Sequence, residues 1–461
     1  MSRRSERLFE ALNEISQQKV DEAAPIEAEV VRRKRGGRTR WLGAVAAVLA
    51  AAIAVGTFLR PGGGLDAYAI AQARYPDTYM TVQLTGISDP EGFFARSAQV
   101  FLTQAEGENR VYSPLNVYLA LSMLAQITDG SSREQILELL GSSSMDTLRG
   151  RAHTMWNANY RDDEWMTSIL ASSLWLDQDV KFDQDTMDIL AQDFYASSYA
   201  GEMGSAELNK ALRDWLSGQT GGLLKKQAGN IKLNGDTALA LASTLYFKAW
   251  WTAGFDKALT GAQTFHAPGG DVRADFMRQR SVEMYYWGDG FTAVNQTFAK
   301  GGAMWFLLPD EGTSPEELLA AGGEAVDFLF SANKYQWDRR EYLYINKSVP
   351  KFDVASQFDL GDGLRSLGVT DVYDPAASDF TPMTSGVDAP IILDQTSHAA
   401  RVMIDEEGCT AAAFTELAVC RLVCDPINEV DFVLDRPFLF CVTGDSGLPL
   451  LVGIVNYPGG R

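Results

Sequence analysis

The stretch IDEEGCTAAAFTELAVC, residues 404–420, alternates in character from Gly408 onward. One set of its positions carries only small or aliphatic side chains: Cys409, Ala411, Ala413, Thr415, Leu417 and Val419. The other set holds the only aromatic ring and the only charge after Gly408: Thr410, Ala412, Phe414, Glu416, Ala418 and Cys420. Because successive side chains of a strand point to opposite faces, this pattern predicts a strand whose first set faces a core. A flexible loop rich in alanine and threonine is the alternative.

Four motifs, the last of which contains the start of this stretch, follow one another along the chain. They read Ser113-Pro-Leu-Asn-Val, with a helix to Leu139-Leu-Gly141; Thr244-Leu-Tyr-Phe-Lys-Ala-Trp-Trp, ending at Phe255-Asp256; Val349-Pro-Lys-Phe-Asp, with Leu364 to Gly368; and Ile404-Asp-Glu-Glu-Gly with Asp435-Arg-Pro-Phe-Leu-Phe, ending at Asn456-Tyr-Pro458. Together they resemble the serpin family of serine protease inhibitors in order and spacing, over about residues 70–461. Each motif alone is weak, whereas the combination is specific.

The pattern of apolar residues predicts an α+β fold. Residues 116–140 form a helical stretch interrupted near Asp129–Gly130, while short apolar runs at 238–247, 304–308 and 438–442 are typical of buried strands. Helices dominate early and strands late, which favours α+β over alternating βαβ units. The resemblance implies one domain of three β-sheets surrounded by helices, with an exposed reactive-centre loop.

The resemblance also assigns roles to individual residues. It implies a hinge at Glu406, Glu407, Gly408, Cys409, Thr410, Ala411, Ala412 and Ala413, and a buried shutter at Ser113, Asn116, Ser243 and His398. Three positions depart from the usual pattern: Asn116 replaces a serine, Ser243 an asparagine, and Cys409 a threonine or serine. A fourth, Phe414, replaces a small residue. Cysteine tolerates burial, so we expect insertion to survive at Cys409, while the bulk of Phe414 slows it.

The implied function is the inhibition of serine proteases. The loop is cut, its first half inserts into the main sheet, and the acylated protease is carried along and trapped. Family spacing from the hinge places the scissile bond at Leu422–Val423, which favours a chymotrypsin-like or elastase-like target. A slip by one residue would place Arg421 at the bond and favour a trypsin-like target. The alternative function is that of a non-inhibitory serpin-fold protein, acting as a substrate or binding module.

Charge and the placement of cysteines and histidines disfavour nucleic-acid binding, a disulfide-held fold and metal binding. Net charge is −20, and the first forty residues carry +3, so the rest carries −23, which disfavours nucleic acid as a partner. The four cysteines, at 409, 420, 424 and 441, all lie near the C-terminus, so a disulfide scaffold is not expected. The three histidines and four cysteines have no zinc-ligand spacing, and no cofactor or metal is expected.

Gly444-Asp-Ser-Gly447 resembles the nucleophile motif of chymotrypsin-like proteases, which raises the possibility of a catalytic role. Such an enzyme needs a histidine base and an aspartate that orients it. Neither His153 nor His398 lies in that sequence context, and the same tetrapeptide suits a tight turn between strands. We therefore expect no catalytic residue and no enzyme activity.

The N-terminal part predicts a membrane anchor. Residues 41–59 are nineteen uncharged residues, which as a helix span roughly 28 Å, close to the thickness of the hydrocarbon layer. A basic block precedes them, so residues 1–40 are expected to form a cytoplasmic head, and residues 60–67 a linker to an extracytoplasmic domain at 68–461. The protein would then be a single-pass protein of the cell membrane. A cleaved signal, giving a secreted protein, and a buried core helix are the alternatives.

Overall fold

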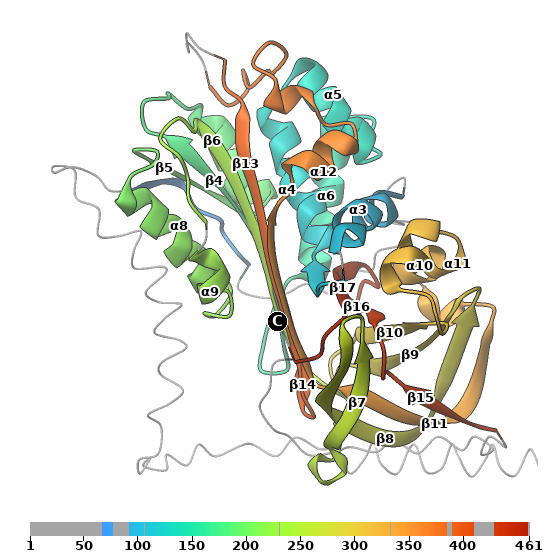
Figure 1. Ribbon diagram of the computed structural model, residues 1–461. Coiled ribbons are helices and arrows are strands. Elements are labelled where there is room, and N and C mark those ends of the chain that lie inside the picture. The colour runs from blue at the N-terminus through green and yellow to red at the C-terminus, as the bar shows by residue number, and fades with distance from the viewer. Residues whose placement is uncertain are drawn as a thin grey trace, which may run out of the picture. The chain divides into compact units, whose positions relative to one another are not determined.

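A computed structural model describes residues 67–76, 92–105, 107–229, 231–331, 333–384, 390–409 and 428–459 (Figure 1). The expected head, membrane segment and nearly all of the linker lie outside these residues, as do Thr410 to Ala413 of the hinge and the loop residues Arg421, Leu422 and Val423. Within the described part, no helix is long and apolar enough to cross a membrane.

Helices are concentrated in the first half of the domain, as the sequence predicts. They are α3 (Phe93–Leu102), α4 (Pro114–Ile127), α5 (Gly130–Leu139), α6 (Met145–Asn159), α7 (Gln184–Asp193), α8 (Ala206–Gln219), α9 (Lys225–Ala228), α10 (Pro315–Ala321), α11 (Glu324–Phe330) and α12 (Gly361–Ser366). Short 3-10 turns occur at η2 (Thr103–Ala105), η3 (Lys257–Leu259), η4 (Lys334–Gln336) and η5 (Asp371–Tyr373). The predicted interruption near Asp129–Gly130 separates α4 from α5.

The first sheet has the strand order β1-β5-β4-β6-β14-β13-β12, and β3 pairs with β4. Its strands are β1 (Tyr68–Ala71), β3 (Arg161–Asp162), β4 (Met166–Asp177), β5 (Ala196–Gly201), β6 (Leu239–Trp250), β12 (Phe352–Asp359), β13 (Leu393–Ile404) and β14 (Gly408–Cys409). Strands β6 and β13 lie side by side in the middle of the sheet, and β14 lies at one end of them (Figure 1).

The second sheet has the order β15-β11-β8-β9-β10-β16-β17-β2, and β7 pairs with β8. Its strands are β2 (Arg110–Tyr112), β7 (Gly261–Ala267), β8 (Gly270–Gly288), β9 (Phe291–Thr297), β10 (Ala303–Pro309), β11 (Arg340–Pro350), β15 (Glu429–Val433), β16 (Phe438–Thr443) and β17 (Pro449–Val455). The expectation of three sheets therefore differs from the hydrogen bonding of the described residues, which joins their strands into two. The cause is β8, whose nineteen residues pair along their length with β7, β11 and β9 and so link two groups of strands.

Strand β6 separates two apolar regions. Its residues Leu241, Leu245 and Phe247 belong to the main core, whereas Ala240 and Ala242 belong to a smaller cluster that includes Leu212 of α8. Because side chains alternate along a strand, odd-numbered positions of β6 face the main core and even-numbered ones face the side of α8. Figure 1 shows α8 and α4 on opposite sides of this sheet.

Helix α4 packs against one face of the first sheet and contributes most of its residues to the main core. Pro114 occupies the first turn, and the side chain of Ser113 caps the helix by accepting a hydrogen bond from the backbone N–H of Asn116. Almost every residue of α4 is buried, since the helix is covered on all sides, including by β4, β6 and β17. Its first turn is thereby fixed against the sheet.

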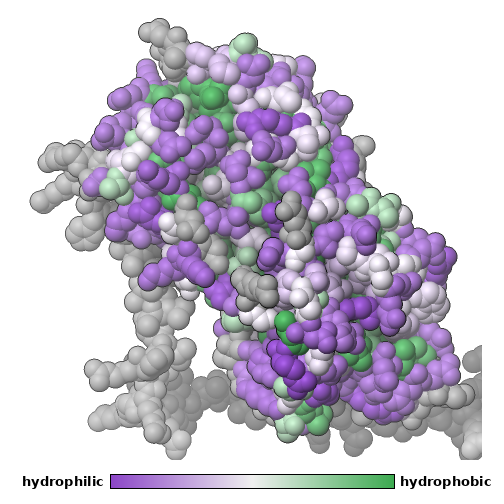
Figure 2. Space-filling model, viewed as in Figure 1, coloured by the Kyte–Doolittle hydropathy of each residue, from purple (hydrophilic) through white to green (hydrophobic). Residues whose placement is uncertain are grey.

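The outer surface is mainly polar. The face shown in Figure 2 is largely hydrophilic, with apolar residues scattered across it. Among the large apolar side chains of the described residues, only Leu259, Tyr335 and Tyr342 are exposed. This pattern is normal for a folded domain that buries most of its large apolar side chains.

Candidate functional site

The hinge begins as a strand within the first sheet. Gly408 and Cys409 form β14, which pairs antiparallel with Trp250 and Ala249 of β6, and Cys409 also pairs with Ile404 of β13. Further along, β6 and β13 pair directly with each other in parallel. Two residues of the hinge are therefore already inserted at the point where β6 and β13 separate.

A tight turn at residues 405–408 leads the chain from β13 into β14. The carboxylate of Asp405 accepts hydrogen bonds from the backbone N–H groups of Glu407 and Gly408, at 2.9 and 3.2 Å. A Cβ atom on Gly408 would lie 2.3 Å from the carbonyl oxygen of Ala249, closer than van der Waals contact permits. Only glycine lets the hinge approach β6 this closely.

Two ion pairs fix this turn to neighbouring strands and loops. The carboxylate of the buried Glu406 accepts a hydrogen bond from Lys351 at 2.9 Å, and Glu407 pairs with Lys257. Burial pushes the pKa of Glu406 up, but the hydrogen bonds that it accepts, chiefly from Lys351, outweigh burial and leave the pKa below its usual value. The indole N–H of Trp251 adds a bond to the carbonyl of Asp405 at 2.9 Å.

Cys409 lies on the core side of the sheet, as the alternation of the stretch predicts. Its side chain belongs to the main core cluster and is 1% exposed. Burial raises the pKa of its thiol to about 12, so the thiol stays protonated at neutral pH. Cys409 therefore acts as a small apolar residue rather than as a nucleophile.

Three of the four residues expected in the shutter form one buried hydrogen-bonded chain. The Nε2 atom of His398 accepts from the backbone N–H of Ser113 at 3.1 Å, and Nδ1 lies 3.1 Å from the hydroxyl of Ser243. Because Nε2 is an acceptor, the ring proton belongs on Nδ1 and is donated to Ser243. Burial lowers the pKa of His398 to about 3, so the ring is neutral at pH 7. The chain links α4, β13 and β6.

Asn116 occupies the same buried region but stands apart from this chain. It is 0% exposed, and neither polar atom of its side chain has a hydrogen-bond partner among the described residues. The resemblance implies a place for Asn116 in this cluster but does not identify hydrogen-bond partners for its side chain.

The far end of the loop re-enters the fold at the edge of the second sheet. Strand β15 begins at Glu429 and pairs in parallel with β11 from Tyr344 onward. The carboxylate of Glu429 accepts from Arg280 at 3.1 Å and from the side chain of Asn346 at 2.9 Å. The segment that contains the expected scissile bond is thus held by strands at both ends.

The Gly-Asp-Ser-Gly motif forms a turn between β16 and β17. The hydroxyl of Ser446 donates to the side-chain oxygen of Asn159 at 2.6 Å, and Asp445 pairs with Arg161 at 3.1 Å. Ser446 is thus bonded to an amide rather than to a histidine base, so the turn lacks the geometry of a nucleophile.

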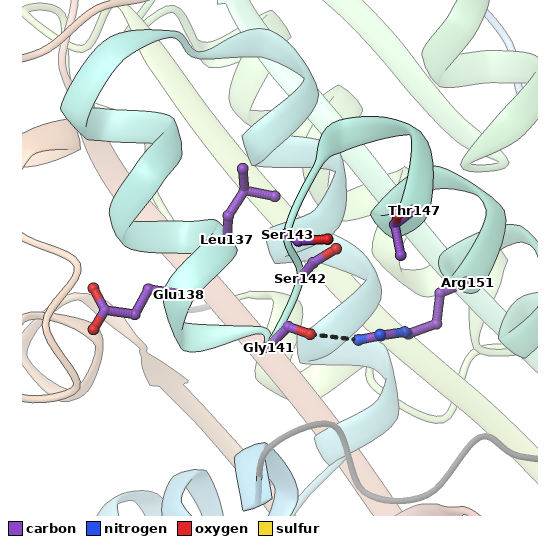
Figure 3. Close-up of a pocket in the computed structure, with 7 residues that line it drawn as sticks. All are labelled: Leu137, Glu138, Gly141, Ser142, Ser143, Thr147 and Arg151. Atoms are coloured by element: carbon purple, nitrogen blue, oxygen red, sulfur yellow. Dashed lines mark hydrogen bonds between the residues drawn. The ribbon is translucent and has the colours of Figure 1, made fainter.

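Two further observations concern ligands. The described residues contain no group of three or more His, Cys, Asp or Glu side chains placed to hold a metal ion. A polar hollow between α5 and α6 is lined by Glu138, Gly141, Ser142 and Arg151, among others (Figure 3). The guanidinium of Arg151 is used within the fold, since it donates to the carbonyls of Leu140 and Gly141 at 3.3 and 3.0 Å.

A family model described as Serpin (serine protease inhibitor) matches residues 91–458. The chain belongs to the serpin family. Among curated relatives, Serpin-ZX of Arabidopsis thaliana is 27% identical over 377 residues, which cover 78% of this chain and 94% of that protein. The rice protein called Putative serpin-Z6C is 28% identical over 382 residues, covering 76% and 91% of the two chains.

Solved structures agree with this assignment. The native state of tengpin, a thermophilic serpin, superposes with a TM-score of 0.73 at 21% identity and covers 84% of this chain and 97% of its own. The structure of Arabidopsis AtSerpin1 in its native stressed conformation has a TM-score of 0.68 at 25% identity, with coverages of 81% and 100%. The predicted α+β serpin fold is therefore confirmed.

Proposed function

We propose that this serpin inhibits serine proteases by loop cleavage and insertion, and that it has no catalytic residue of its own. The observation that carries the proposal is the position of β14, which already occupies the entrance between β6 and β13. Insertion of the loop can continue from β14 without a separate step that forms the first strand pairing, because the first two residues of the inserting strand are already in register.

The register of β14 can be continued into the loop. Six residues after Cys409 stands Thr415; six residues before Ala249 in β6 stands Ser243, and six before Ile404 in β13 stands His398. The direct pairing of His398 with Ser243 places those two level with each other independently. Continued insertion would therefore bring Thr415 between the two strands at the buried polar cluster.

The same register supports the expected facing of the loop. Odd-numbered loop residues would oppose odd-numbered residues of β6, which face the main core, and would do so as small or aliphatic side chains. Phe414 and Glu416 would oppose Thr244 and Ala242, on the side of α8. The one aromatic ring and the one charge would thus avoid the main core and face the side of the smaller cluster.

We propose Leu422–Val423 as the bond that the protease attacks, with a chymotrypsin-like or elastase-like target. Arg421 and a trypsin-like target are the second candidate. The test is incubation of the protein with a panel of serine proteases, followed by denaturing gels and sequencing of the released C-terminal peptide. A covalent complex and a peptide that starts at Val423 are expected; a peptide that starts at Leu422 would instead assign the bond to Arg421.

A pair of variants tests insertion itself. Ala411→Arg would place a charge toward the core, which costs several kcal/mol when the charge is unpaired, and should convert the inhibitor into a substrate. Ala412→Arg makes the same change on the opposite face and is the matched control. Free turnover of the unaltered protein by every protease tested would favour the alternative, a non-inhibitory serpin that serves as a substrate or binding module.

We also propose that residues 41–59 anchor the protein in the cell membrane, with residues 1–40 in the cytoplasm and the domain from residue 68 outside. The uncharged run and its basic flank support this. Protease added to intact cells should cut the loop and spare an epitope tag at residue 1. Release of the domain into the medium without the first 59 residues would indicate the secreted alternative.

A further inference from the structure

The chain enters the first sheet at the end opposite the hinge. Tyr68, the first residue of β1, pairs with Ala200 of β5, and Ala200 pairs with Leu176 of β4. Leu176 in turn pairs with Leu239, the first residue of β6. The hinge strand β14 pairs instead with residues 249 and 250, at the far end of β6 (Figure 1). Tyr68 is therefore level with one end of β6, which we call the linker end, and the hinge is level with the other.

The attachment of β1 to the domain is fixed by contacts beyond the strand pairing. The backbone N–H of Ala73 donates to the hydroxyl of Ser197 in β5 at 3.1 Å. The ring of Tyr75 packs against those of Trp156 and Tyr160, with centroids 5.4 and 5.6 Å apart. Because these contacts hold the segment along the sheet edge, the point at which the preceding chain leaves the domain is defined.

The distance between the two ends of β6 exceeds the reach of the preceding chain. Leu239 and Ala249 are ten residue steps apart, so the hinge lies about 33 Å beyond the level of Tyr68. Nine residue steps separate Leu59, the end of the uncharged run, from Tyr68. A glycine-rich chain of that length has a root-mean-square end-to-end distance of about 17 Å. Even when fully extended it spans at most about 32 Å. The hinge end of the sheet therefore cannot face a membrane that holds residues 41–59.

Exposed charges at the linker end are mainly negative. They lie in the turns after β4 and β5, before β6 and at the start of β13: Asp179, Glu202, Asp236 and Asp394, with Lys181 and Lys232 as the nearby cations in sequence. Anionic lipids repel carboxylates within about 8 Å of a bilayer surface at physiological ionic strength. These charges oppose adsorption of the domain, which would then stand on its linker instead of lying on the bilayer.

We propose that the anchored domain stands with its linker end toward the membrane and its hinge directed away from it. The loop then meets proteases of the surrounding medium, and not proteases held close to the same membrane. The proposal rests on the proposed anchor at residues 41–59 and does not depend on trapping. Its consequence is a choice of partner by height, because the hinge lies about 33 Å beyond the linker end.

The first test uses the full chain in vesicles that contain phosphatidylcholine and phosphatidylglycerol. Cys420→Ser and Cys424→Ser remove the loop thiols. Cys409 and Cys441 are buried and do not react in the folded protein, so one introduced cysteine can be labelled selectively. Acceptor dyes are carried by the lipid headgroups.

The donor dye is attached at one of two exposed positions. Asp236→Cys lies at the linker end, and Ala258→Cys lies at the hinge end, next to Lys257, which pairs with Glu407 of the hinge turn. With about 33 Å between the two levels, energy transfer to the lipids should be at least about twofold more efficient from position 236 than from position 258. Equal efficiencies, or a higher efficiency from position 258, would overturn the proposal.

The second test measures how fast a chymotrypsin-like protease cuts the loop, which happens whether the protease is trapped or released. Soluble protease should cut the vesicle-bound chain as fast as the chain in detergent. The same protease is then attached to the vesicles by tethers of about ten or about a hundred residues, which reach about 17 and about 55 Å, and the long tether should give at least about fivefold faster cutting.

The outcomes separate this proposal from the proposed function. Equal cutting through both tethers, or slow cutting of the vesicle-bound chain by soluble protease, would overturn the orientation. A chain that does not float with the vesicles would overturn the anchor and the orientation together. Cutting without a covalent complex would overturn inhibition alone, and the energy transfer would still decide the orientation.

Discussion

Lowering the pH from 7 to 5 should destabilise the intact protein through a single buried residue, His398. Both of its ring nitrogens are engaged, one as an acceptor from the backbone N–H of Ser113 and the other beside the hydroxyl of Ser243. A second proton would have to go on Nε2, where it would face the N–H of Ser113, donor against donor. Burial already lowers the pKa of His398 to about 3. The rings of Tyr112 and Phe358 pack edge-on against it and offer no charge that could stabilise an imidazolium.

The direction and magnitude of the change in unfolding free energy follow from the difference between the pKa values of His398 in the folded and unfolded states. The pKa of His398 is lower in the folded state than in the unfolded chain, where it is about 6.5, so between these values the unfolded chain binds more protons. The stabilisation is complete above the unfolded pKa and is lost as the pH falls toward the folded one. With about 1.4 kcal/mol for each pH unit, the free energy of unfolding should drop by about 2 kcal/mol between pH 7 and pH 5.

The measurement is the unfolding midpoint of the intact protein at a series of pH values, for the unaltered chain and for His398→Asn. The variant has no titrating group at this position, so its stability should fall by about 2 kcal/mol less over the same range. His266→Gln is the control, because His266 is exposed and pairs with Asp271, and its loss should leave the acid destabilisation in place. Equal slopes for His398→Asn and the unaltered chain would refute the reasoning.

Three further predictions concern the hinge and the loop. Gly408→Ala should displace β14, since the new Cβ would lie 2.3 Å from a carbonyl oxygen of β6, and should make the hinge sensitive to limited proteolysis; an unchanged digestion pattern would contradict this. Lys351→Ala should lower the free energy of unfolding by roughly 1–3 kcal/mol, because Glu406 is buried and would keep its charge without its main partner, whereas Lys351→Arg should retain most of the stability. If Cys420 and Cys424 form a disulfide, the two halves of the cut loop stay tethered and the protease is not trapped, so a thiol reductant should restore complex formation. Mass spectrometry shows whether the bridge is present. If the bridged protein and a Cys420→Ser, Cys424→Ser double variant inhibit equally, such a switch is excluded.

The elements that position the hinge were predictable from short patterns. The strand expected at 238–247 is β6, the run at 438–442 is β16, and the predicted break near Gly130 separates two helices. These predictions succeed because apolar runs and helix breakers act locally. The number of sheets was not predictable, because it depends on which strands β8 bonds along its length, and strand pairing is not encoded in any one segment.

The partners of the buried residues were only partly predictable. Family position places His398 and Ser243 together, but the sequence does not say which nitrogen of the ring is protonated or that the amide of Asn116 lacks a partner. Those facts depend on distances of tenths of an ångström between elements far apart in the chain. The pairing of Glu406 with Lys351 was missed for the same reason, although a charged residue beside an expected buried strand was a signal that a partner was needed.

The position of β14 also bears on how insertion could be both favourable and slow. In the register of β14, residues 410–413 would enter where β6 and β13 are not paired with each other, and from residue 414 onward each inserted residue would separate a direct parallel pair, the first being Thr244 with Ala399. Each inserted residue would also gain an antiparallel neighbour on either side, so the sheet would gain hydrogen bonds as it opens. Against this gain, continued insertion in this register would bring Phe414 and then Glu416 to the side of the sheet where Ala240 and Ala242 pack in the cluster of α8. The carboxylate of Glu416 would lose its bonds to water on that side of the sheet, which costs free energy unless a hydrogen-bond donor replaces them. We therefore expect the barrier to insertion at residues 414–416, past the alanines of the hinge, where delay would favour release of the cut loop over trapping of the protease.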